Sequence, residues 1–343
     1  MKRLLNTLYI TSGNRYLSLD GENVVVMEDK KEIGRIPLHN LQAIVTFGYT
    51  GASPALMGAC AQRNIELSFM SGNGRFLARV SGEEKGNVTL RKTQYRISEK
   101  KKERVKIAKN FILGKVYNTR WVLERAARDY SMRLDAELLK KKSAFLGQSM
   151  NKIRECEEAE TLLGLEGEAA SVYFSAFDEL ILQQKEDFYF HGRNKRPPLD
   201  DVNAMLSFGY SLLAGMCGGA LEAVGLDPYV GFFHTDRPGR MSLALDLMEE
   251  FRSVMVDRFV LTLINKRIMK PEYFLTKENG AVIMTEEGRK AFLSAWQGKK
   301  QEMITHPLLS EKIEWGMVPY AQSMLLARFL RGDLDEYPPF LWK

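Results

Sequence analysis

The pattern of hydrophobic residues changes along this 343-residue chain, and the change constrains the fold more than any other feature. Up to about residue 80, short β-prone runs alternate with glycine-containing turns, which is typical of β-sheet. From about residue 100 to about residue 330, apolar residues recur at intervals of three and four, the spacing of amphipathic helices. The sequence therefore predicts an α+β protein, with a β-rich domain over residues 1–85, a linker over 86–100 and a larger all-α domain over 101–343.

The β-rich region carries its own turn and cap signals. Asp20-Gly21 is a two-residue hairpin signal between two β-prone runs. Ser53-Pro54 predicts a helix start, with serine as the N-cap and proline at the first helical position. No catalytic set is evident in this region, and we assign it to homodimer formation. Strands are expected within residues 8–11, 16–19, 24–27, 44–47, 65–69 and 75–80.

A stretch of 20 residues without a charge, from Val202 to Leu221, has the length of a membrane-spanning helix. It also contains Asn203, Tyr210 and four glycines, which suit a helix inside a protein better than one in lipid. We therefore interpret it as the core helix of the helical domain.

Other features indicate a reduced, cytoplasmic protein. The N-terminus lacks an apolar signal core and a small-residue cleavage site. The three cysteines have neither CxxC nor zinc-like spacing, which argues against a disulfide framework.

The chain is basic, with a net charge of +6 and a pI of about 9.0. Such a charge permits binding to nucleic acid or to an anionic membrane and proves neither. Residues 91–120 carry eleven basic side chains against two acidic ones. Two interpretations stay open. These side chains form solvated helix faces, or they form a phosphate-contacting surface, which would make binding strongly salt-dependent.

Three stretches of the predicted helical domain contain carboxylates and one imidazole. Glu166 lies within Gly164-Leu-Glu166-Gly167, and His234 follows two phenylalanines. A later helical segment carries Asp246, Glu249 and Glu250. Two or three carboxylates and one imidazole can hold a divalent cation, which can organise attack on a phosphodiester. We expect Glu249 in a shallow cleft and Asp246 at the rim of the site, as a supporting carboxylate or a ligand of a second metal.

Each of these residues also has a purely structural interpretation. Glu166 alone is typical of a first-turn glutamate that interacts with its helix dipole. A histidine that ends an apolar run, as His234 does, is often a hydrogen-bonded structural group. Asp246 and Glu249 alone would fit the solvated acidic face of an amphipathic helix.

Several other chemistries are disfavoured by the sequence. It contains no GxxxxGK[ST] phosphate loop, which argues against a nucleotide-driven motor. It also contains neither a GxSxG elbow nor an HExxH helix, the signatures of two large hydrolase groups.

The sequence around the candidate residues resembles that of the CRISPR-associated endonuclease/integrase family, the larger adaptation protein of CRISPR systems. Four motifs occur in the family's order: Gly164-Leu-Glu166-Gly-Glu-Ala-Ala170 with Tyr173-Phe174; Arg196-Pro-Pro-Leu-Asp-Asp-Val-Asn203-Ala-Met-Leu-Ser-Phe-Gly-Tyr210; Gly225-Leu-Asp-Pro-Tyr-Val-Gly-Phe-Phe-His234; and Leu243-Ala-Leu-Asp-Leu-Met-Glu249-Glu-Phe-Arg252. Three further stretches resemble the type I-C branch: Leu4-Leu-Asn-Thr-Leu-Tyr, Tyr16-Leu-Ser-Leu-Asp-Gly-Glu-Asn23 and Phe47-Gly-Tyr-Thr-Gly-Ala-Ser-Pro54.

This resemblance implies a fold, a metal site and an activity. The family has an N-terminal β-rich domain and a larger α-helical domain, as the hydrophobic pattern also predicts. Its catalytic metal ligands map to Glu166, His234 and Glu249, although some branches have aspartate at the last position. The implied cofactor is Mg²⁺ or Mn²⁺, which fits mixed nitrogen and oxygen ligands.

The implied reaction inserts short DNA fragments into a CRISPR array by attack of a fragment's 3′-hydroxyl on a phosphodiester. The implied partners are double-stranded DNA, a second copy of the chain and the smaller CRISPR adaptation protein in a heterohexamer. From the residues beside the motifs we expect DNA contacts from a basic set consisting of Arg193, Lys195, Arg196, Arg237, Arg240 and Arg252.

Three of the residues near the motifs keep alternative roles. Arg252 contacts DNA or pairs with a neighbouring carboxylate. Tyr173 orients the DNA near Glu166 or is a core tyrosine. Asn203 supports the site by hydrogen bonding or caps its helix. Two rival functions are also retained: a metal-dependent nuclease of branched DNA repair intermediates, and a DNA-binding scaffold without enzymatic activity.

Overall fold

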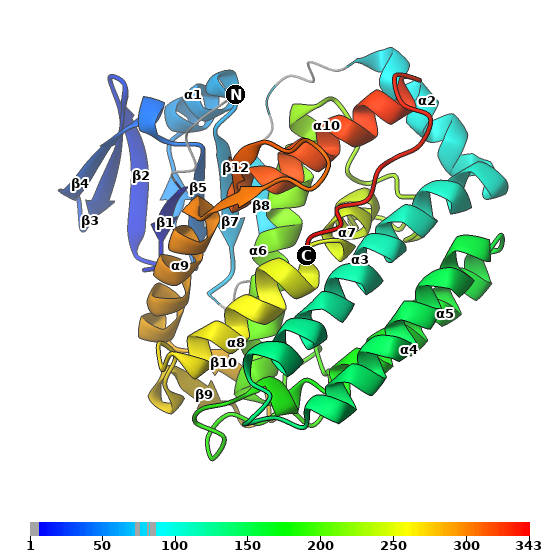
Figure 1. Ribbon diagram of the computed structural model, residues 1–343. Coiled ribbons are helices and arrows are strands. Elements are labelled where there is room, and N and C mark those ends of the chain that lie inside the picture. The colour runs from blue at the N-terminus through cyan, green and yellow to red at the C-terminus, as the bar shows by residue number, and fades with distance from the viewer. Residues whose placement is uncertain (1–6, 73–75, 81, 83–86) are drawn as a thin grey trace.

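The computed structural model describes residues 7–72, 76–80, 82 and 87–343, and it consists of a β-sheet region followed by a mostly helical region (Figure 1). The predicted fold class is therefore confirmed. Some predicted features lie outside the described residues: the start of the first type I-C stretch, residue 75 of the last expected strand and residue 86 of the expected linker.

The N-terminal region contains two four-stranded sheets and one helix. One sheet has the order β4-β3-β2-β6 and the other the order β1-β5-β7-β8. In the second sheet β1, β5 and β7 are parallel and β8 is antiparallel to β7. The elements are β1 (Thr7–Ile10), β2 (Arg15–Asp20), β3 (Asn23–Glu28), β4 (Lys31–Pro37), β5 (Ala43–Phe47), β6 (Gly51–Ala52), α1 (Pro54–Arg63), β7 (Glu66–Met70) and β8 (Phe76–Val80).

The local signals in this region are confirmed. β2 and β3 form an antiparallel hairpin in which Asp20 pairs with Asn23, and Gly21 has a φ of +55°. Ser53 caps α1 by accepting a hydrogen bond from the Leu56 amide at 3.2 Å. The sequence did not predict β4, an edge strand with three exposed residues at its start, because no buried hydrophobic run marks it.

The helical region begins earlier than expected. Most of the segment 86–100 predicted as a linker is helix α2 (Val88–Glu99), which Asn87 caps. The division into domains itself remains a prediction. The longer helices that follow are α3 (Lys101–Asp129), α4 (Ala136–Glu155), α5 (Ala159–Phe174), α6 (Asp201–Ala223), α7 (Ser242–Glu249), α8 (Arg258–Asn265), α9 (Glu286–Gln301) and α10 (Val318–Leu330).

Short elements complete this region. Two antiparallel pairs, β9 (Phe274–Thr276) with β10 (Val282–Met284) and β11 (Met303–Thr305) with β12 (Lys312–Glu314), interrupt the helices. A π-helical segment, Arg252–Asp257, joins α7 to α8. In Figure 1, α3 runs diagonally through the helical region, with α4 and α5 on one side and α7 on the other.

The uncharged stretch lies in α6, at the centre of the helical region (Figure 1). Among the described residues α6 is the one helix long and apolar enough to cross a membrane, but 61% of its apolar 18-residue window is buried inside the protein. Its packing against α7, α10 and the π-helical segment agrees with the predicted core helix.

The packing of α6 predicts unequal effects at two of its glycines. A Cβ at Gly209 would lie 2.7 Å from Val256 Cγ1 and 3.4 Å from Phe292 Cζ, whereas a Cβ at Gly215 would meet nothing within 4 Å. We expect Gly209→Ala to lower the free energy of unfolding by about 1–3 kcal/mol through overpacking. Gly215→Ala should raise it by up to about 1 kcal/mol through helix propensity. Urea unfolding of both variants checks this, and equal effects would contradict it.

Candidate functional site

Glu166 and Glu249, 83 positions apart in the sequence, meet at one ammonium group. Glu166 comes from α5, Glu249 is the last residue of α7, and Lys115 of α3 lies between them. Lys115 Nζ forms an ion pair with Glu166 Oε1 and a second one with Glu249 Oε2 at 2.7 Å. Helix α3 packs against both α5 and α7, so the fold itself brings the three side chains together.

Glu249 is almost fully buried, at 3% exposure, and two cations compensate its charge. Arg252 Nη1 donates to Glu249 Oε1 at 2.6 Å, whereas Lys115 contacts the other oxygen, Oε2. Burial alone would raise the pKa of Glu249, but Arg252, Lys115 and His234 together lower it to about 2. Glu249 is therefore ionised at neutral pH. Of the two alternatives for Arg252, a DNA contact or pairing with a neighbouring carboxylate, the structure has the carboxylate pair.

His234 is held by Asp246. Asp246 Oδ1 lies 2.7 Å from His234 Nδ1, and the Asp246 carboxylate also accepts hydrogen bonds from three consecutive amides, those of Phe232, Phe233 and His234, at 2.6–2.9 Å. A proton on Nδ1 satisfies this carboxylate and directs the lone pair to Nε2, which is the arrangement found in histidine metal ligands.

Asp246 is fully buried, so its expected place at the rim of the site is wrong. The loop before α7 folds back over its carboxylate. A Cβ at Gly231 would lie 2.9 Å from Asp246 Oδ2 and 2.8 Å from the His234 carbonyl oxygen, so only glycine fits this approach. The acidic helix is thus not a solvated face, because Asp246, Glu249 and Glu250 are all buried.

Glu250 points away from the site and fixes the C-terminal tail. Its carboxylate accepts hydrogen bonds from the Tyr337 hydroxyl and the Phe340 amide, each at 2.5 Å, and from Gln322 Nε2 at 3.2 Å. Asn118 of α3 reinforces this contact, because its Nδ2 donates to the carbonyl oxygens of Glu250 and Phe340. The tail after α10 lies along this part of α3 in Figure 1.

Asn203 holds the loop that precedes α6. Its side chain accepts from Arg193 Nη1 at 2.6 Å and donates to the Gly192 carbonyl at 2.8 Å. The N-cap of α6 is Asp200, whose carboxylate accepts from the Asn203 amide at 2.7 Å. Asn203 is therefore not the N-cap of α6, and its support of the candidate site by hydrogen bonding stays a prediction.

Beneath Glu249, a buried polar network connects α6 to the π-helical segment. The Tyr210 hydroxyl donates to Asp257 Oδ1 at 2.5 Å, and the guanidinium of Arg252 lies 4.2 Å from the centre of the Tyr210 ring. Tyr173 is also buried here, at 2% exposure, beside Phe174 and Phe177, and burial followed by Asp257 raises its pKa. Tyr173 is therefore a core residue behind the site.

The residues expected to contact DNA fall into two groups. Arg193, Arg240 and Arg252 are partly buried and contact protein groups, such as Asn203, Ser242 and Glu249 respectively. Lys195, Arg196 and Arg237 have exposed side chains. Burial and three neighbouring arginines lower the pKa of Lys195, while Glu249 opposes this shift, which places Lys195 in the electrostatic field of the site.

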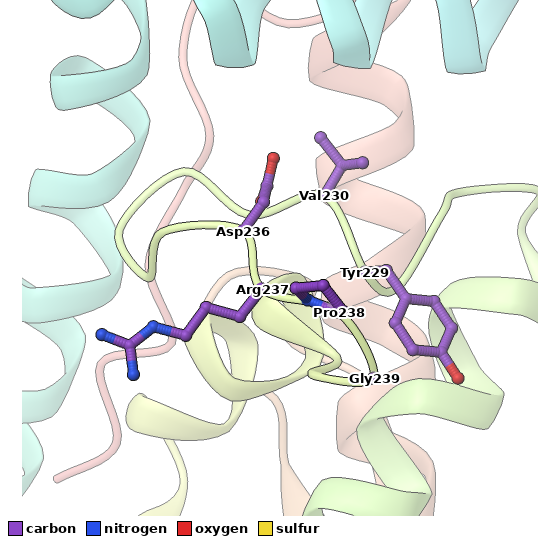
Figure 2. Close-up of a pocket in the computed structure, with 6 residues that line it drawn as sticks. All are labelled: Tyr229, Val230, Asp236, Arg237, Pro238 and Gly239. Carbon is purple, nitrogen blue, oxygen red and sulfur yellow. The ribbon is translucent and has the colours of Figure 1, made fainter.

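Figure 2 shows a pocket beside the His234 loop. Its volume is about 380 Å³, and its lining residues are Tyr229, Val230, Asp236, Arg237, Pro238 and Gly239. Arg237 and Tyr229 extend to opposite sides of this pocket. None of its lining residues belongs to the cluster of Lys115, Glu166 and Glu249, so the pocket and that cluster are separate features.

The donors at the site fit a hard divalent cation, although the described part of the chain contains no group of three histidine, cysteine or acidic side chains that are already placed to hold a metal ion. The Lys115 ammonium takes the position between the two carboxylates that a cation would need. Two carboxylates and an imidazole whose Nε2 faces no described hydrogen-bond partner are suitable ligands for Mg²⁺ or Mn²⁺.

Sequence reasoning did not single out Lys115. It counted this lysine among eleven basic residues of 91–120 without a separate role. One signal was present, because Lys115 occurs in a segment with apolar spacing and follows Gly114, where helices can approach closely. A Cβ at Gly114 would lie 2.9 Å from Glu250 Cγ.

Comparison with known proteins now identifies the family. The sequence profile described as "CRISPR associated protein Cas1" matches residues 8–298. The chain belongs to the Cas1 family. It is 51% identical over 347 residues to CRISPR-associated endonuclease Cas1 2 of Rhodospirillum rubrum and 46% identical over 343 residues to CRISPR-associated endonuclease Cas1 1 of Chlorobaculum tepidum, and both alignments cover 100% of both chains. The implied family is confirmed, and the type I-C branch stays a prediction.

Solved structures share the Cas1 fold with this chain. A casposase bound to integration product matches with a TM-score of 0.84 and 24% identity, over 98% of this chain and 93% of the other. A chain of the "Cas6-RT-Cas1--Cas2 complex" matches with a TM-score of 0.82 and 21% identity, over 100% of this chain and 36% of that longer one. At these identities the likeness establishes the fold alone.

The contacts of Asp246 predict a role in metal binding. An asparagine there cannot accept all four hydrogen bonds, because its amide nitrogen donates. We expect Asp246→Asn to weaken Mn²⁺ binding, measured by calorimetric titration, by about 10–100-fold. The matched control is Asp236→Asn on the same loop, an exposed residue that accepts one hydrogen bond from Gly231 at 3.2 Å. The control should change binding by no more than about twofold. Equal losses in the two variants would contradict the assignment.

The tail contact predicts a pH dependence of stability. Burial raises the pKa of Glu250 from 4.5 to about 8, although Tyr337, Phe340 and Gln322 oppose this shift. Between these values the folded protein binds more protons than the unfolded chain, so this carboxyl lowers the free energy of unfolding as pH rises. In metal-free buffer, Glu250→Gln should gain more than about 1.4 kcal/mol relative to wild type from about pH 5 to about pH 8. Exposed Glu168→Gln is the control, and parallel curves would refute the prediction.

Proposed function

We propose that this Cas1 protein is a metal-dependent integrase and endonuclease that inserts short foreign DNA fragments into a CRISPR array. One observation carries the proposal: Glu166 and Glu249 converge on a single cation while Asp246 orients the imidazole of His234. In support, relatives at 51% and 46% identity carry the name CRISPR-associated endonuclease, and the solved casposase of the same fold is bound to an integration product.

The proposed reaction is a transesterification that needs no oxidant, reductant or nucleotide. The 3′-oxygen of a fragment forms a P–O bond with a phosphorus at the leader–repeat junction, and the P–O bond to the leaving 3′-oxygen of the array strand breaks. The attacking hydroxyl loses one proton and the leaving oxygen gains one. No protein side chain becomes covalently linked. Water in place of the 3′-hydroxyl gives strand cleavage.

Glu166, His234 and Glu249 would hold Mg²⁺ or Mn²⁺ in this reaction. When bound, such an ion polarises the phosphate and stabilises the charge that develops on its oxygens. Glu249 stays ionised because its pKa is about 2 and Arg252 fixes one of its oxygens. Asp246 contacts the His234 amide and Nδ1, which leaves Nε2 as the ring nitrogen that would bind the ion.

For DNA contacts we favour the exposed cations Lys195, Arg196 and Arg237. Phosphate contacts position the DNA and should make affinity fall with salt. Arg193, Arg240 and Arg252 would act mainly through the loops and the carboxylate that they contact.

The proposed assembly consists of homodimers, formed by the β-rich domain over residues 1–85, which flank the smaller adaptation protein, Cas2. A solved complex of a Cas1-containing chain with Cas2 supports this choice of partner. DNA as the substrate, together with the reduced cysteines, supports a cytoplasmic location. We retain the type I-C branch as part of the proposal.

Strand transfer tests the function. Wild-type protein, Cas2 and a short duplex are incubated with a supercoiled leader–repeat plasmid and Mn²⁺, and joined product is quantified. We expect Glu166→Ala and His234→Ala each to lower joining by at least about 100-fold, because each removes a metal ligand. A fragment without its 3′-hydroxyl should give no joined product. Exposed Glu168→Ala, two residues from Glu166 in α5, is the matched control and should retain activity.

The other outcomes separate the rival functions. Cleavage without joining would favour a nuclease of branched DNA. Tight DNA binding with neither reaction would favour a scaffold. Joining that survives Glu166→Ala and His234→Ala would place the active site elsewhere.

A further inference from the structure

Lys115 occupies one oxygen of each carboxylate that would hold the metal ion. It contacts Glu166 Oε1 and Glu249 Oε2, whereas Arg252 takes the other oxygen of Glu249. Glu249 Oε2 is buried, and Lys115 is its one ion-pair partner among the described residues. A metal ion held by Glu166 and Glu249 would therefore compete with the Lys115 ammonium for these two carboxylates.

Charge balance indicates which of the two basic groups moves. In the metal-free site two carboxylates face two cations, so a divalent ion would add an excess of two positive charges. Arg252 is fixed by its bond to Glu249 Oε1 and by its position over the Tyr210 ring. Among the described residues the two carboxylates are the ion-pair partners of Lys115, and its four-carbon stem is flexible.

The displaced ammonium needs another anion. The Lys115 side chain is only 14% exposed, and an unpaired charge in such a place is costly. Asp246 already accepts from three amides and the His234 ring, and Glu250 is engaged by the C-terminal tail. Among the described residues these two carboxylates are thus already engaged, and the proposed function supplies another anion, the phosphate of the DNA.

We propose that Lys115 is a catalytic residue with two positions. In the metal-free protein it holds Glu166 and Glu249 together as their counter-ion, and in the metal-bound complex its ammonium binds a non-bridging oxygen of the phosphate under attack. There it stabilises negative charge without forming a covalent bond or transferring a proton. The phosphate-bound position rests on the proposed function, whereas the counter-ion position does not.

The test compares Lys115→Met with Lys106→Met, an exposed lysine nine residues earlier in α3. Mn²⁺ affinity is measured by electron paramagnetic resonance without DNA, and single-turnover joining at saturating Mn²⁺. We expect Lys115→Met to bind Mn²⁺ about tenfold more tightly, because the competing charge is gone. The same variant should join DNA about 100-fold more slowly, because a charge-stabilising donor is lost. Lys106→Met should change neither quantity by more than about twofold.

Opposite changes in metal affinity and rate are the signature of the proposal, since damage to the fold would weaken both. Unchanged or weaker Mn²⁺ binding by Lys115→Met would overturn the counter-ion position, and tighter binding with an unchanged rate would overturn the phosphate contact. If circular dichroism shows that Lys115→Met does not fold, Lys115→Gln takes its place. If wild type joins no DNA, the proposed function fails, but the Mn²⁺ comparison still decides the counter-ion position.

Discussion

The buried carboxylate of Glu249 is the group on which the architecture of the site depends. An ionised carboxylate inside a protein is stable only when opposite charges and hydrogen bonds compensate it. Arg252, three residues after Glu249, supplies one of these charges. Lys115 of α3 supplies the other, and it also forms an ion pair with Glu166 of α5. The relative positions of α3, α5 and α7 are therefore tied to the neutralisation of one side chain.

Three acidic residues in a little more than one helical turn contact three different parts of the protein. Asp246 faces the His234 loop, Glu249 faces the site, and Glu250 faces the C-terminal tail. The helix changes to a π-helical segment at Arg252, just after these residues, and such irregularities are frequent at functional sites. This segment carries both Arg252, which pairs with Glu249, and Asp257, which anchors Tyr210.

Local chemistry was readable from the sequence wherever it depended on neighbours in the chain. The Asp20-Gly21 turn and the Ser53 cap need only two to four residues, and both occur as predicted. Asp246 was misplaced because helical spacing alone does not reveal that a loop will close over its carboxylate. Lys115 was missed because its role depends on the packing of α3 against α5 and α7. Its partners Glu166 and Glu249 lie 51 and 134 positions further along the chain.

The charge balance of the site also explains how it can be stable without a metal ion. Lys115 and Arg252 satisfy the carboxylates that would otherwise repel one another, so folding need not await a cofactor. Removal of Glu166 leaves Lys115 paired with Glu249, and the site then has two cations for one carboxylate, an excess of one positive charge. In the proposed mechanism the metal-free and metal-bound states depend on overlapping but different sets of contacts, so one lysine can stabilise the first state and contact the phosphate in the second.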